Sequence, residues 1–155
     1  PKRTPYPLPA QPKSRVKLLE MILPSDEDLD ISKEKILVGI GRGIENQDNV
    51  ALAEELADVL GGALCASRPV IDQGWLPSSR LVGKSGKTIK PKLYLALGIS
   101  GAPEHVEAIG ESEIIIAVNT DPNAPIFNVA RYGTTENLLD LSEELKLSIQ
   151  EMKEP

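Results

Sequence analysis

Residues 92–105 read KLYLALGISGAPEH, and this stretch decides the fold. An apolar run over 92–98 ends in a glycine, and a turn of small residues follows it. Residues 101–110 then predict a short helix, which tolerates Pro103 in its first turn. A buried strand that leads through a tight turn into a helix is typical of a parallel sheet covered by helices.

A second unit of this kind precedes it. Residues 36–40, ILVGI, predict a short buried strand, and residues 46–62 predict a helix with Asn46 or Asp48 as its cap and Gly61 at its end. One face of this helix is apolar at helical spacing, through Ala53, Leu56, Ala57 and Leu60.

The rest of the chain continues the alternation. Further strands are predicted at 16–23, 63–67, 113–119 and 129–133, with the run EIIIAVN at 113–119 buried on both faces. The chain closes on an amphipathic helix whose apolar residues are Leu138, Leu141, Leu145 and Ile149. The long stretch 68–91 shows no periodicity and predicts a functional loop. The predicted fold class is therefore α/β: a three-layer α/β/α, Rossmann-like parallel sheet with helices on both faces.

Composition limits the classes of function. The 155 residues suit one domain, which we expect over 16–155 after a basic, proline-rich linker over 1–15. Seventeen basic and 23 acidic residues give a net charge of −6, which argues against nucleic acid as the main partner. The basic linker leaves contact with nucleic acid or anionic lipid as an alternative, but a joining arm is favoured.

Cysteine and histidine are each present once, as Cys65 and His105, so neither an internal disulfide nor a zinc site is expected. No apolar run is long enough for a bilayer, and no signal-peptide pattern opens the chain. We therefore expect no membrane insertion and a cytoplasmic location.

Four segments follow predicted strands, and ligands of parallel sheets bind at the carboxyl ends of strands. These segments are GRGIEN at 41–46, SRPVIDQG at 67–74, GISGAPEH at 98–105 and VNTDP at 118–122. Ile44 stands where a dinucleotide fingerprint needs glycine, so a tight strand-to-helix turn is favoured, although Arg42 could reach a phosphate. GKS at 83–85 lacks the earlier glycine and the preceding strand of a nucleotide-binding P-loop.

Two of these segments carry candidate ligand-binding side chains. Ser100 and Gly101 lie where a strand meets a helix, a place that favours anions, and His105 could face the same ligand. Taken alone, however, an exposed helical histidine is the favoured alternative. Ser67 and Arg68 end another strand, and a surface salt bridge is the alternative role for Arg68.

Taken together, the segments 67–77, 82–105 and 114–133 resemble the C-terminal FAD-binding domain of the electron transfer flavoprotein alpha subunit. The resemblance runs from about Ile36 to Leu147. The proline-rich start is similar to the segment before this domain in the family, and we expect the family's N-terminal domain to be absent from this chain.

The resemblance implies that the domain holds FAD. It places Arg68 beside the flavin ring with the Ser85 hydroxyl near N5, and His105 near the pyrimidine carbonyl. The implied cofactor-binding residues are Arg42, Ser67, Arg68, Val82, Gly83, Lys84, Ser85, Ser100, Gly101, Ala102, Pro103, Glu104, His105, Asn119, Asn137 and Leu138. The last group, Asn119, Asn137 and Leu138, is expected at the adenosine end.

Departures from the family pattern concern charge. Lys84 stands where glutamine is common, Pro103 and Glu104 replace Ile-Gln, and Asn137 replaces an aspartate. We expect Glu104 to raise the pKa of His105.

The resemblance implies an electron carrier rather than a stand-alone enzyme. It would work with an electron transfer flavoprotein beta subunit and carry electrons from dehydrogenases to a downstream acceptor. The alternatives are an NAD-dependent oxidoreductase or other nucleotide-binding domain on a related fold, and an interaction module without a cofactor.

Overall fold

The computed structural model describes residue 19 and residues 29–153. The predicted linker over 1–15 and the predicted strand over 16–23 lie outside the described residues, apart from Leu19. The described part contains one sheet of five strands: β1 (Ile36–Ile40), β2 (Ala63–Ala66), β3 (Leu93–Leu97), β4 (Ile114–Val118) and β5 (Tyr132–Thr134). Four of them lie where the sequence predicts them; β5 starts three residues later than predicted.

All neighbouring strands are parallel, in the order β2-β1-β3-β4-β5. The chain turns outward from β1 to β2 on one side and from β3 through β4 to β5 on the other. The strand order therefore reverses between β1 and β3, which is where doubly wound sheets open a crevice for ligands. This confirms the predicted α/β class with a parallel sheet.

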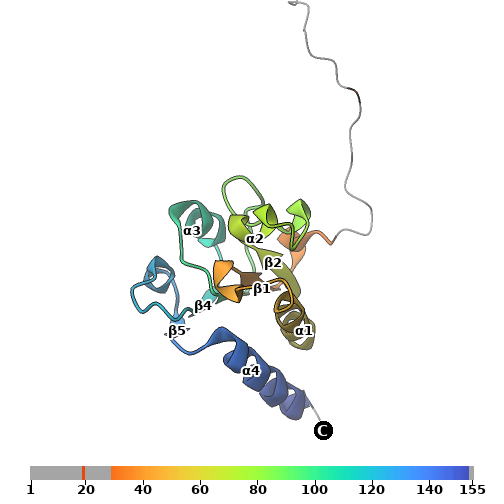
Figure 1. Cartoon of the computed structure of the whole chain (residues 1–155), viewed down its shortest axis with the longest axis vertical. Coiled ribbons are helices and arrows are strands. Elements are labelled where there is room, and N and C mark those ends of the chain that lie inside the picture. Colours follow the sequence, from red (N-terminus) through yellow and green to blue (C-terminus); the bar gives the residue numbers. More distant parts are fainter. Residues whose placement is uncertain (1–18, 20–28, 154–155) are drawn as a thin grey trace, which may run out of the picture.

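Helices cover both faces of this sheet (Figure 1). On one face, α1 (Val50–Leu60) packs beside α4 (Leu138–Lys153), and on the other lies α3 (Pro103–Ile109). Gly61 ends α1 in the left-handed conformation, as predicted. The Asn46 side chain accepts the N–H of Asn49 at 3.1 Å ahead of α1, whereas Asp48 makes no such bond.

Alternate residues of each strand pack into two separate hydrophobic cores, one on each face of the sheet. Val38, Ile40 and Leu97 face α1 and α4, whereas Leu37, Tyr94 and Ala96 face α3. Each fully buried leucine or isoleucine contributes about 2 kcal/mol through removal from water. Two apolar layers on opposite faces of a parallel sheet explain why its strands read as continuous apolar runs.

Two predictions need correction. Residues 68–91 are not one irregular loop: they contain α2 (Arg68–Asp72), a 3₁₀ turn over Ser78–Arg80, and a bridge from Leu81 to Ala66. The β4 strand is not fully buried on both faces, because Ile114 and Ile116 are only half-buried. Ile116 lies at an apolar cavity of about 320 Å³ between the sheet and α4.

Within the part of the chain that the structure describes, no helix combines the length and the apolar character needed to cross a membrane.

The turn after β1 rests directly on the end of β3. Gly41 and Gly43 donate their N–H groups to the carbonyls of Leu97 (2.9 Å) and Gly98 (3.0 Å). A Cβ atom on Gly41 would lie 2.3 Å from the Gly98 oxygen, and Gly98 itself has φ +63°. The two backbones can approach this closely only without side chains. Gly41 and Gly43 of GIGRGIEN therefore serve the favoured strand-to-helix turn.

Another glycine makes room for a side chain inside the sheet. A Cβ atom on Gly39 would lie 2.0 Å from the Tyr94 hydroxyl oxygen and 2.5 Å from the ring carbon that bears it. We expect Gly39→Ala to lower the free energy of unfolding by about 1–3 kcal/mol, because overpacking displaces the tyrosine. Urea unfolding measures this change.

Gly110→Ala is the matched control. Its φ is −61°, and its added Cβ would meet atoms only at 3.5 Å and beyond, which is ordinary contact. A Gly39→Ala protein as stable as the Gly110→Ala protein would contradict this account of the β1–β3 packing.

Candidate functional site

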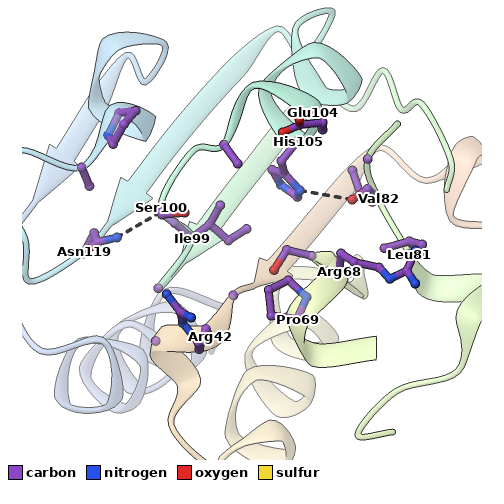
Figure 2. Close-up of a pocket in the computed structure, with 18 of the residues that line it drawn as sticks. Arg42, Arg68, Pro69, Leu81, Val82, Ile99, Ser100, Glu104, His105 and Asn119 are labelled. Atoms are coloured by element: carbon purple, nitrogen blue, oxygen red, sulfur yellow. Dashed lines mark hydrogen bonds between the residues drawn. The ribbon is translucent and has the colours of Figure 1, made fainter. Parts of the chain in front are cut away.

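A cavity of about 710 Å³ lies at the carboxyl ends of the strands, where the strand order reverses. This volume is within the range of about 300–1,000 Å³ typical of small-molecule and cofactor sites. Residues of all four segments singled out in the sequence line it (Figure 2). The lining residues are Gly41, Arg42, Gly43, Ser67, Arg68, Pro69, Leu81, Val82, Gly83, Lys84, Ser85, Gly98, Ile99, Ser100, Ala102, Glu104, His105, Asn119, Asp121, Ala124 and Pro125.

The turn over residues 98–102 offers backbone donors at this cavity. Within residues 29–153, the N–H groups of residues 99–102 donate to no protein acceptor. The turn is held from behind, because the Asn119 side-chain amide donates to the Ile99 carbonyl at 3.0 Å and the Ser100 carbonyl accepts the N–H of Ile126 at 3.0 Å. A fixed turn with unused N–H groups suits an anionic group such as a phosphate.

The loop over residues 81–87 forms the opposite wall and is tied to α3. Inside the loop, the Gly86 N–H donates to the Gly83 carbonyl at 2.8 Å, which makes a tight turn. The Lys84 N–H donates to the Glu104 carbonyl at 3.0 Å, and farther on Ile89 bonds to Ala108. These bonds place the side chains of Lys84 and Ser85 beside the cavity.

Arg68 joins this loop to α2. Its Nε lies 2.6 Å from Asp72 Oδ1, and its Nη1 donates to the Ser85 hydroxyl at 3.3 Å. The Arg68–Asp72 pair is exposed, so it contributes little to stability. Its effect is to hold the guanidinium at the rim of the cavity (Figure 2), within hydrogen-bond distance of the Ser85 hydroxyl. The salt bridge considered from sequence is therefore present, in the same place as the candidate site.

His105 is buried, with 6% of its surface exposed, so the alternative of an exposed surface histidine is wrong. Its Nδ1 lies 3.1 Å from the Val82 carbonyl oxygen and its Nε2 lies 2.9 Å from the Tyr94 hydroxyl (Figure 2 shows the first bond). Both ring nitrogens are thus engaged by the protein. A hydrogen bond from His105 to a ligand requires one of them to be exchanged.

Burial lowers the pKa of His105 to about 4, because the charged ring is cut off from water; the bond to Val82 offsets part of this effect. The expectation that Glu104 raises this pKa is wrong, since burial lowers the pKa and the one opposing effect comes from the Val82 carbonyl. His105 is therefore neutral near pH 7.

The structure brings most of the predicted site residues to the cavity and excludes a few. Gly101 packs against the backbone of Ile126, where an added Cβ would lie 2.3 Å from the nitrogen, and Pro103 begins α3 without lining the cavity. Asn137 caps α4 by accepting the Leu139 N–H at 2.8 Å. Leu138 is buried in the core shared by α1 and α4. Neither Asn137 nor Leu138 lines this cavity, and their expected contacts at the adenosine end stay predictions.

Sequence reasoning missed several lining residues. Most belong to the same turns as the predicted ones and could have been added from their position: Gly41, Gly43, Pro69, Gly98, Ile99 and Asp121. Ala124 and Pro125 come from the turn after β4. No sequence pattern could have placed Leu81 at the cavity, because its position depends on the bridge to Ala66 at the end of β2.

Comparison with known proteins agrees with this geometry. A family model described as "Electron transfer flavoprotein FAD-binding domain" matches residues 30–110. The chain belongs to this family. FAD is accordingly the cofactor of the domain.

Three relatives are similar over most of this chain. The electron transfer flavoprotein subunit alpha of Methylophilus methylotrophus is 49% identical over 123 residues, covering 79% of this chain and 38% of its own. Protein FixB of Clostridium saccharobutylicum is 43% identical, and the match covers 89% of this chain and 41% of that protein. The acryloyl-CoA reductase electron transfer subunit beta of Anaerotignum propionicum is 44% identical, and the match covers 90% of this chain and 39% of that protein. The chain thus spans about two fifths of the length of these relatives.

The residues at the cavity of this FAD-binding domain fit the chemistry of FAD. Arg42, Arg68 and Lys84 supply positive charge, and the turn over 99–102 supplies unused N–H donors for a pyrophosphate. Apolar side chains such as Leu81, Val82 and Ile99 offer surface for an aromatic ring system. Glu104 and Asp121 are acidic, so the net positive charge at the cavity is small.

The buried histidine predicts a pH dependence of stability. Between pH 6.5 and about 4 the unfolded chain binds a proton at His105 and the folded chain does not, so the free energy of unfolding falls as the pH falls. The loss of unfolding free energy over this window is about 3 kcal/mol, because a pKa difference of one corresponds to about 1.4 kcal/mol. We expect His105→Gln to remove this part of the slope, as measured by urea unfolding at several pH values.

Glu104→Gln is the control, since Glu104 lies next to the histidine yet does not set its pKa. It should keep the histidine-dependent slope. Identical pH slopes for the wild type and His105→Gln would show that His105 is not buried in its neutral form.

Proposed function

We propose that this domain is the FAD-binding part of an electron transfer flavoprotein alpha subunit and acts as an electron carrier rather than a stand-alone enzyme. The observation that supports this most strongly is a cavity lined by free N–H donors, arginines and apolar side chains at the strand-order reversal, in a chain of this family. When bound, FAD supplies the chemistry, because its ring system accepts and returns electrons one or two at a time.

The residues proposed to contact FAD are the predicted ones that line the cavity. Arg42 and the N–H groups of residues 99–102 are proposed to hold the pyrophosphate. The cavity members of this set are Arg42, Ser67, Arg68, Val82, Gly83, Lys84, Ser85, Ser100, Ala102, Glu104, His105 and Asn119.

Arg68 and Ser85 are proposed to act on the ring system as a pair. Ser85 accepts a hydrogen bond from Arg68, so the proton of its own hydroxyl remains available for an acceptor in the cavity. The Arg68 guanidinium beside it stabilises negative charge on a reduced ring, and this effect grows when water is excluded. Together they orient a ring nitrogen and hold a proton near it.

The partners are proposed from the relatives. A beta subunit of an electron transfer flavoprotein would cover the open side of the cavity, dehydrogenases would donate electrons, and a downstream acceptor would receive them. The relative of Anaerotignum propionicum is named as an electron transfer subunit of acryloyl-CoA reductase, which supports a reductase as one class of partner. We further propose that residues 1–15 link a domain over 16–155 to another part of the protein, and that the protein works in the cytoplasm.

Titration with FAD tests the proposed function. We expect saturable one-to-one binding that changes the flavin absorbance and fluorescence, with NAD and ATP unable to compete. Arg68→Ala should weaken FAD binding about ten-fold or more, as expected for loss of a charge-assisted contact. The titration is made on the chain alone and with the beta subunit present.

Arg131→Ala is the matched control. Arg131 stacks on the ring of Tyr132 at 5.8 Å and does not line the cavity, so its removal should leave FAD affinity unchanged. The proposal fails if FAD does not bind in either condition, or if both arginine variants lose affinity equally.

A further inference from the structure

Behind His105 lies a buried tyrosine that does not line the cavity. Tyr94 stands in β3, is 0% exposed and belongs to the core on the α3 side of the sheet. Its hydroxyl oxygen is 2.9 Å from His105 Nε2, and the two rings lie 6.0 Å apart between centroids. A hydroxyl buried among apolar side chains is costly unless it forms hydrogen bonds, so this contact needs an explanation beyond packing.

The sheet leaves space for this hydroxyl. The neighbouring strand β1 carries Gly39 beneath the tyrosine, and any larger residue there would overlap the hydroxyl oxygen at about 2.0 Å. A phenylalanine at position 94 would cover the same apolar surface without the need for a polar partner. The pair Gly39 and Tyr94 therefore places an oxygen atom at a fixed point below His105.

The partners of the histidine define which groups donate. The Val82 carbonyl can only accept, so Nδ1 of His105 carries the proton and Nε2 has a free lone pair. The Tyr94 hydroxyl must then donate to Nε2.

We propose that Tyr94 is a positioning residue of the cofactor site: its hydroxyl fixes the tautomer and orientation of His105, and His105 in turn holds the loop over residues 81–87 through the Val82 carbonyl. The part of this proposal that concerns FAD rests on the proposed function. The part that concerns the histidine does not, because it is a property of the chain itself.

The loop depends on this link at the point where the cofactor residues begin. Val82 is followed directly by the tight turn that carries Lys84 and Ser85. The backbone bond from Lys84 to Glu104 ties the far side of the turn to α3. On the near side Val82 is held twice, by its N–H to the Ala66 carbonyl at 2.9 Å and by its carbonyl to the histidine ring. Loss of the Tyr94 hydroxyl frees the ring and so weakens the bond to the Val82 carbonyl, while the Val82 N–H and the far side stay held.

The presence of a single histidine makes the test direct. With ¹⁵N-labelled histidine, the chain without FAD gives one pair of ring-nitrogen signals at pH 7.5. The expected wild-type spectrum shows a protonated Nδ1 and an unprotonated Nε2 that accepts a hydrogen bond. In Tyr94→Phe we expect the Nε2 signal to move toward that of a free imidazole nitrogen. FAD binding should weaken about five-fold, the effect of one neutral hydrogen bond.

Tyr132→Phe is the control, because Tyr132 is 58% exposed and does not line this cavity. It should change neither the nitrogen signals nor the FAD affinity. If Tyr94→Phe does not fold, the wild-type spectrum still decides, since a protonated Nε2 overturns the proposal. An unchanged Nε2 signal in a folded Tyr94→Phe protein overturns it as well. A wild type that shows the expected tautomer but binds no FAD contradicts the proposed function and leaves the positioning of His105 intact.

Discussion

The backbone contact between residues 41–43 and Gly98 fixes how closely the ends of β1 and β3 approach. Hydrogen bonds from Gly41 and Gly43 reach the carbonyls of Leu97 and Gly98, and no side chain fits between the two turns. From this junction the chain leaves in opposite directions, toward β2 and toward β4. The space above the junction is therefore open, and segments from both sides of it line the cavity.

Binding residues at this site come from turns that the rest of the fold holds rigid. The turn over 98–102 is held by hydrogen bonds from Asn119 and Ile126, and the N–H groups of residues 99–102 have no acceptor within residues 29–153. The loop over 81–87 is held to α3 by hydrogen bonds, one of which comes from His105. Because these donors are already oriented, the energetic cost of ordering them is met by folding rather than by cofactor binding.

Local sequence signals predicted four of the five strands in place and the helices α1, α3 and α4, but not α2; most of the predicted cavity residues came from the resemblance to the family. Apolar runs predict β1, β3 and β4, because strands of a covered parallel sheet are buried on both faces. Contacts set by packing could not be predicted: the bridge that brings Leu81 to the cavity joins distant segments. Asn137 and Leu138 lie outside the cavity, in the cap of α4 and in the core beneath it, so their expected contacts at the adenosine end stay predictions. The neutral state of His105 depends on desolvation, which depends on the completed fold.

Mapping of backbone amide shifts during addition of FAD tests the central claim most directly, namely that the cavity above the β1–β3 junction holds the cofactor. The account predicts that the largest changes fall on residues 99–102 and 82–86 and on Arg42 and Arg68. Residues around the apolar cavity beneath α4, such as Ile116 and Leu145, should change little. Changes centred on that second cavity, with the turn over 99–102 unaffected, would contradict it.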